Sequence, residues 1–209
     1  MSKNAQILLE NLIEQEFQGN ESYGDISDYF EFFSASQILK NQGLSDDEIE
    51  NGIVGKGLDG GCDSIYLFLN NLLITPDIVE HISAPKDSIL ELIIIQSKKT
   101  TSFGEDAIMK WKTVSSNLLD LSNTITDFST RYNADVLEAF TTFRDTYTKL
   151  ITSRIKLKFR FYYATLASDL HPNVEQQAEE LKGTDPETLK KKKEAKEQEE
   201  AFYQQAYEG

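Results

Sequence analysis

The segment spanning residues 88–99, SILELIIIQSKK, constrains the fold of this chain most strongly. It is apolar and β-branched at its centre, and turn residues bound it. A run of this kind is typical of a strand that is buried on both faces in the middle of a sheet. We therefore expect an α/β domain in which this segment is the central strand and helices flank a small mixed sheet.

The remaining segments supply the other elements of this domain. Helical spacing of apolar residues and capping signals predict helices over residues 5–17, 26–43, 45–53, 105–121 and 134–152. Strand formers predict strands over residues 64–69, 72–75 and 154–168, with a tight turn at 70–71 and a loop over 76–85. Further helices are predicted to begin at Pro172 and Pro186. We thus expect one domain over residues 1–182, with N-terminal helices (1–56) and a catalytic core (57–168). Residues 183–209 are expected to be a charged helical tail or the start of a truncated region.

Composition limits the classes of function. The formal net charge is −14, which argues against a general nucleic-acid coat protein because phosphate repels a negative surface. The single cysteine, Cys62, excludes an intramolecular disulfide and fits a reducing compartment. No apolar run approaches the roughly 20 residues of a membrane helix. We expect a soluble, cytoplasmic protein with no membrane partner.

One local basic surface is predicted within this acidic chain. Residues 154–168 alternate, so that Lys156, Lys158 and Arg160 share the face opposite a buried apolar one. Together with Lys99, these cations are candidates for binding nucleic acid. Protection of an edge strand by lysine is the alternative explanation for the 156–160 face.

The candidate site begins in GLDGGCDSIYLFLN, residues 57–70, which holds Asp59 and Asp63 in a glycine-rich turn ahead of an apolar strand. Gln96 and Lys98 lie near the end of the central strand, where a period of two places them on one face. If the two strands pair, Asp63 meets them, and carboxylate and amide oxygens are ligands that suit Mg²⁺. Lys98 could then orient water or meet charge on a phosphate. Alternatively, the aspartates bond turn amides and Gln96 and Lys98 end the strand in solvent.

The order D…QxK across two strands resembles the PD-(D/E)XK, or restriction-endonuclease-like, nucleases. Four longer segments resemble the N-terminal domain of abortive-infection phage-resistance (AIPR) proteins. They are DYFEFFSASQIL, LSDDEIENGIVGKGLDGGCDSIYLFLNN, LELIIIQSKKTTSFGEDAI and LKFRFYYATLAS. The likeness extends over residues 25–180.

The resemblance implies a restriction-endonuclease-like core and a metal-dependent nuclease that uses Mg²⁺ or Mn²⁺ and acts on DNA or RNA in anti-phage defence. It assigns Asp63 as the main metal ligand, Gln96 to the variable acidic position and Lys98 as the catalytic lysine. Glu31, in YFEFF, would reach the metal from the preceding helix, unless it only belongs to the polar face of that helix. Asp59 would support the ligands.

Family proteins are longer, so the chain is expected to be a fragment or a stand-alone version. A homo-oligomer, or a larger C-terminal domain in the parent protein, is a further expectation. The alternative is an inactive nuclease-like module that binds or senses a protein partner.

Overall fold

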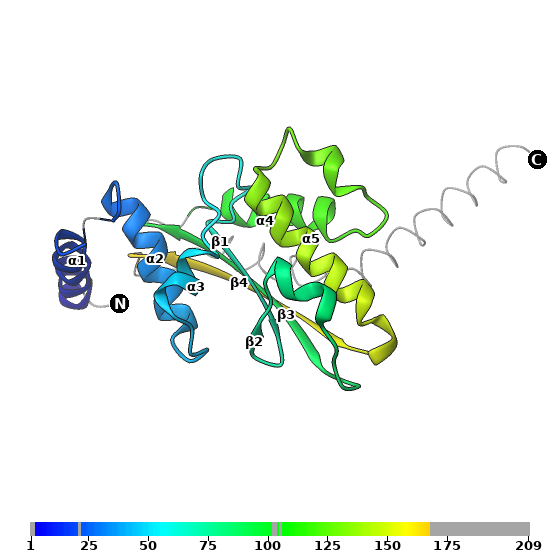
Figure 1. The fold of residues 1–209 in the computed structure, drawn as a ribbon. Coiled ribbons are helices and arrows are strands. Elements are labelled where there is room, and N and C mark those ends of the chain that lie inside the picture. The colour runs from blue at the N-terminus through cyan, green and yellow to red at the C-terminus, as the bar shows by residue number, and fades with distance from the viewer. Residues whose placement is uncertain (1–2, 21, 102–103, 105, 168–209) are drawn as a thin grey trace, which may run out of the picture.

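A mixed four-stranded sheet lies at the centre of the computed structural model, which describes residues 3–20, 22–101, 104 and 106–167 (Figure 1). The strands are β1 (Ser64–Leu69), β2 (Leu72–Leu73), β3 (Ile89–Lys98) and β4 (Lys156–Thr165), in the order β2-β1-β3-β4. β1 is antiparallel to both β2 and β3, whereas β4 runs parallel to β3. The predicted α/β class is confirmed, and the apolar segment is the interior strand β3.

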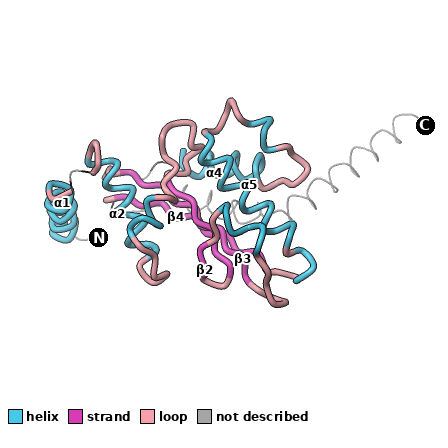
Figure 2. The backbone as a smooth tube through the Cα atoms, viewed as in Figure 1, coloured by secondary structure: helices cyan, strands magenta, loops and turns pink. Residues whose placement is uncertain are grey.

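Helices cover both faces of this sheet, as the tube drawing shows (Figure 2). α2 (Ile26–Leu39) and α3 (Asp46–Glu50) lie on one face, α4 (Asp106–Leu118) and α5 (Ala134–Lys149) lie on the other, and α1 (Lys3–Gln18) packs against α2. Short 3₁₀ helices are η1 (Pro76–His81), η2 (Ile125–Phe128) and η3 (Ile151–Ser153). None of these described helices is long and apolar enough to cross a membrane.

Alternation along β3 creates two cores. Leu92 and Ile94 pack in the cluster that includes α4 and α5, while Ile93 and Ile95 pack against α2 on the other face. Complete burial of one such side chain contributes about 1.5–3 kcal/mol. Burial on both faces therefore fixes the position of β3, and with it the position of the residues at its C-terminal end.

Local signals set the ends of several elements. Ser45 and Glu48 form the predicted capping box at the start of α3. Asn70 and Asn71 have φ angles of 49° and 71°, which suit the tight turn between β1 and β2. Asn133 caps α5 by accepting a hydrogen bond from the backbone N–H of Val136.

Some predicted bounds were wrong. The strand predicted to reach residue 75 ends at Leu73, and the segment predicted as a loop after it begins with η1, since Pro76 suits the first position of a helical turn. The helix predicted to reach residue 152 ends at Lys149 and gives way to η3. The helices predicted at Pro172 and Pro186, and the tail over 183–209, lie outside the described residues.

Candidate functional site

Asp63 immediately precedes β1 and is buried, with 8% of its surface exposed. Its backbone N–H donates to the carbonyl of Ile95 at 2.9 Å, and its Oδ2 accepts a hydrogen bond from the backbone N–H of Ser97 at 2.6 Å. Burial raises the pKa of the Asp63 carboxyl to about 6, although the Ser97 hydrogen bond lowers it. The charges of Lys98 and Lys110 also lower this pKa. The carboxylate is therefore held at the end of β3, close to both lysines.

Gln96 lies next to Asp63 on the neighbouring strand and is 3% exposed. Among the described residues its Oε1 has no hydrogen-bond partner. This oxygen is 3.5 Å from the point where a Cβ on Gly61 would stand, so it faces the glycine-rich loop. Leaving a buried acceptor without a partner costs about 1–3 kcal/mol. A cation at this point would remove that cost.

Lys98 follows Gln96 on the same face of β3 and is exposed at the strand end. Lys99 points away from the site, because it forms an ion pair with Glu14 of α1 at 3.8 Å. Lys110 of α4 was not predicted as a site residue, and its methylene groups lie beside Gly61. No motif marks Lys110, which only the packing of α4 against the loop brings to the site.

Glu31 approaches the same place from α2. Its two carboxylate oxygens lie 2.9 and 3.3 Å from the point where a Cβ on Gly55 would stand, and the Cα of Asp63 lies 3.2 Å from that point. Burial, followed by the charge of Asp63, raises the pKa of Glu31 to about 8. The half-buried Glu31 carboxyl thus lies close enough to the buried Asp63 to feel its charge, a setting that favours a proton or a cation near the two groups.

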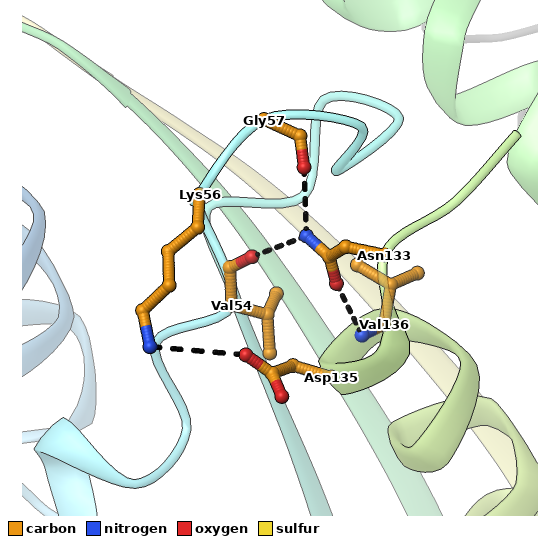
Figure 3. A network of polar contacts seen from close by, with 6 residues as sticks. All are labelled: Val54, Lys56, Gly57, Asn133, Asp135 and Val136. Atoms are coloured by element: carbon orange, nitrogen blue, oxygen red, sulfur yellow. Dashed lines mark hydrogen bonds and ion pairs between the residues drawn. The ribbon is translucent and has the colours of Figure 1, made fainter.

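The glycine-rich loop, residues 57–61, is fixed to α5 by one side chain (Figure 3). Asn133 Nδ2 donates to the carbonyls of Val54 and Gly57, each at 2.9 Å. Lys56 and Asp135 add an exposed ion pair at 3.9 Å. These contacts hold the start of the loop over the N-terminus of α5.

The second half of the loop is fixed to α4. Trp111 Nε1 donates to the carbonyl of Gly61 at 2.6 Å, and a Cβ on Gly60 would come within 2.4 Å of Val114. Asp59 Oδ1 accepts a hydrogen bond from the N–H of Gly61 at 2.6 Å, so this aspartate has the turn role that was its alternative explanation. Its charge also raises the pKa values of the two carboxyls described above. A rigid loop of this kind places Asp63 with little freedom.

The predicted basic face of β4 is balanced by acidic side chains. Lys158 and Arg160 both form ion pairs with Glu91 of β3, at 3.0 Å for the lysine. Lys156 lies 3.8 Å from Asp87. β4 is also an edge of the described sheet, which agrees with the edge-protection explanation for these cations.

The oxygen atoms that Asp63, Glu31 and Gln96 offer can be compared with the ligands that a divalent metal ion requires. Among the described residues, no group of three histidine, cysteine, aspartate or glutamate side chains is placed to hold a metal. The site offers two carboxylates, from Asp63 and Glu31, and the amide oxygen of Gln96. These are hard oxygen donors, and Mg²⁺ commonly completes such a set with water. The unpartnered Gln96 oxygen fits this ion, with modest affinity expected because one of the three donors is uncharged.

Comparisons with known proteins returned no family model, no curated protein and no solved structure that matches this chain. Functional assignment therefore depends on the chain's own residues and their geometry.

Proposed function

We propose that this protein is a divalent-metal-dependent nuclease that hydrolyses phosphodiester bonds in DNA or RNA. In this proposal it has a PD-(D/E)XK core, belongs with the N-terminal domains of AIPR proteins and acts in the cytoplasm in defence against phage. The supporting observation is that Asp63, fixed to the end of β3 by Ser97, lies across from Gln96, whose buried Oε1 has no partner among the described residues. Glu31 adds a second carboxylate near the backbone of Asp63.

Each residue has a distinct role in this proposal. Asp63, Gln96 and Glu31 would hold Mg²⁺ or Mn²⁺, which when bound supplies an activated water and neutralises phosphate charge. Lys98, exposed at the end of β3, would place its ammonium against the negative charge that develops on the phosphate. Ser97 fixes the orientation of the Asp63 carboxylate through its backbone N–H.

The test is cleavage of mixed DNA and RNA substrates with and without Mn²⁺, using wild type and Asp63→Ala. Asp77→Ala, which changes an exposed aspartate on η1, serves as the matched control. We expect Mn²⁺-dependent cleavage by wild type and the control, and none by Asp63→Ala. A wild type that cleaves neither substrate, or an Asp63→Ala protein that cleaves as well as wild type, would contradict the proposal.

A second candidate is an inactive nuclease-like module that binds a protein partner. The ion pairs of Lys158 and Arg160 with Glu91 favour it, because they reduce the basic charge available to nucleic acid on β4. Binding of Mn²⁺ beside Asp63 separates the two candidates. An inactive module needs no ion there, whereas the nuclease cannot work without one.

A further inference from the structure

A hollow of about 640 Å³ opens beside the candidate site, between the glycine-rich loop and α4. Its lining combines cations with exposed apolar groups. The side chains that matter here are Leu58, Asp59, Met109, Lys110, Arg131 and Tyr132. Lys110, which lines the hollow, packs beside Gly61, and the Oε1 of Gln96 lies 3.5 Å from the point where a Cβ on Gly61 would stand, so the hollow lies next to the site.

Leu58 is held in an unfavourable backbone conformation at the rim of this hollow. Its φ angle is 52°, in the left-handed region, and 62% of its surface is exposed. Its carbonyl accepts a hydrogen bond from the N–H of Asn133 at 2.9 Å, which fixes the residue in place. Burial does not explain a leucine here, and strain of this kind often accompanies a functional role. Met109 of α4 is likewise 53% exposed on the facing wall.

Two exposed cations flank these apolar side chains. The methylene groups of Lys110 lie 3.1 and 3.2 Å from the point where a Cβ on Gly61 would stand. Arg131 lines the hollow next to Tyr132. Asp59 is the one carboxylate among the described lining residues, and its Oδ1 already accepts a bond from Gly61. The lining thus suits a ligand with anionic groups and exposed flat apolar surfaces.

We propose that this hollow binds a single strand of nucleic acid and leads it to Asp63. Lys110 and Arg131 would contact successive phosphates, and Leu58 and Met109 would contact unpaired bases. The statement that the strand leads to Asp63 rests on the proposed nuclease function. In a duplex the base faces are stacked inside, so apolar contacts of this kind favour a single strand.

The test measures the binding of labelled oligonucleotides of about 16 nucleotides in EDTA over a range of salt concentrations. The arms are single-stranded DNA, single-stranded RNA and duplex DNA, and the variants are Lys110→Ala and Arg131→Ala. Lys86→Ala, an exposed lysine before the far end of β3, is the control. Each lost phosphate contact should weaken single-strand binding about fivefold at 0.1 M salt and reduce the salt slope by about 0.7. Lys86→Ala should match wild type.

Leu58→Gly tests the apolar contact separately, because glycine adopts a positive φ without strain. We expect single-strand binding to weaken with an unchanged salt slope, while the thermal unfolding midpoint stays equal or rises. Leu72→Ala, an exposed leucine at the opposite end of the sheet, should leave binding unchanged. Unchanged binding by Leu58→Gly would overturn the role given to Leu58.

Cleavage in Mn²⁺ by the same preparations separates this inference from the proposed function. If wild type cleaves but Lys110→Ala and Arg131→Ala bind as wild type does, the proposed strand binding in the hollow is wrong and the proposed nuclease function is retained. If the variants lose binding but wild type does not cleave, strand binding in the hollow is supported and the proposed nuclease function is wrong. A wild type that binds no single strand, or that binds duplex equally well, would contradict the proposal that the hollow binds a single strand. The preferred single strand, DNA or RNA, identifies the substrate class.

Discussion

Replacing Asp63 by asparagine should stabilise the metal-free protein at neutral pH. Asp63 is buried, and burial raises the pKa of its carboxyl from the ordinary value of 3.8 to about 6. A carboxyl whose pKa is higher in the folded state disfavours folding wherever it is ionised. Asparagine has the same shape and keeps an oxygen that can accept the hydrogen bond from Ser97.

The size and sign of this effect follow from the two pKa values. One pKa unit corresponds to about 1.36 kcal/mol, so the Asp63 carboxylate costs about 3 kcal/mol of folding free energy at pH 7.5. The cost develops as pH rises from the unfolded pKa to the folded pKa and is constant above it. At pH 4 only about 0.5 kcal/mol of it is present. Asp63→Asn should therefore gain most at neutral pH and little in acid.

Urea denaturation in EDTA at pH 7.5 and pH 4 measures this difference, with Asp77→Asn as an exposed control. Addition of Mn²⁺ should then stabilise wild type and leave Asp63→Asn almost unchanged, since the variant lacks the main ligand. A variant that is less stable than wild type at pH 7.5, or that gains equally at both pH values, would refute the argument that burial of this charge is unfavourable.

Three further predictions concern the lysine, the second carboxylate and the loop. Lys98→Ala should reduce cleavage by a factor of about 100 or more with an unchanged circular dichroism spectrum, and Lys98→Arg should not restore it, because a planar fork cannot replace a compact ammonium. Wild-type cleavage by Lys98→Ala would exclude this role. Because the pKa of Glu31 is raised to about 8, the ion must displace a proton, so Mn²⁺ affinity should increase as pH rises toward 8. Calorimetry in two buffers of different ionisation enthalpy should detect that proton, and equal heats in both would contradict the prediction. Gly60→Ala should lower the free energy of unfolding by about 2–4 kcal/mol in urea denaturation, because the strain of a positive φ and the overlap of the new Cβ with Val114 add. Gly43→Ala, where φ is also positive but no atom lies near the new Cβ, should cost only about 1 kcal/mol. Equal losses would show that the overlap at Gly60 is relieved.

The sequence predicted those features that depend on local pattern. The apolar run of β3, the alternation in β4 and the paired asparagines at 70–71 each specify a conformation through neighbouring residues alone. Strand parity placed Gln96 and Lys98 on one face of β3, and the glycine-rich lead placed Asp63 before β1. These positions agree with the structure because a strand buried on both faces has little freedom in register.

Contacts between distant segments were not predictable in this way. Asn133 holds the glycine-rich loop from a position 76 residues beyond Gly57, and no local pattern links the two. Glu91 lies within an apolar run, so its pairing with Lys158 and Arg160 became apparent only from the parallel register of β3 and β4. The same pairing reduces the case for a nucleic-acid track on β4.

Several unfavourable features occur together at one end of the sheet. Asp63 and Glu31 are carboxyls whose pKa values burial raises. The buried oxygen of Gln96 has no hydrogen-bond partner within the part of the chain that the structure describes, and Leu58 has a left-handed backbone. Each of these lowers stability, and among the described residues other buried oxygens, such as those of Ser115 and Thr146, also have no hydrogen-bond partner. Strain and unsatisfied polar groups are common at functional sites. One divalent cation would satisfy the first three features at once, and a bound strand would account for the fourth. An inactive module would retain all four costs without compensation, and for this reason the nuclease is the proposal that explains more of the structure.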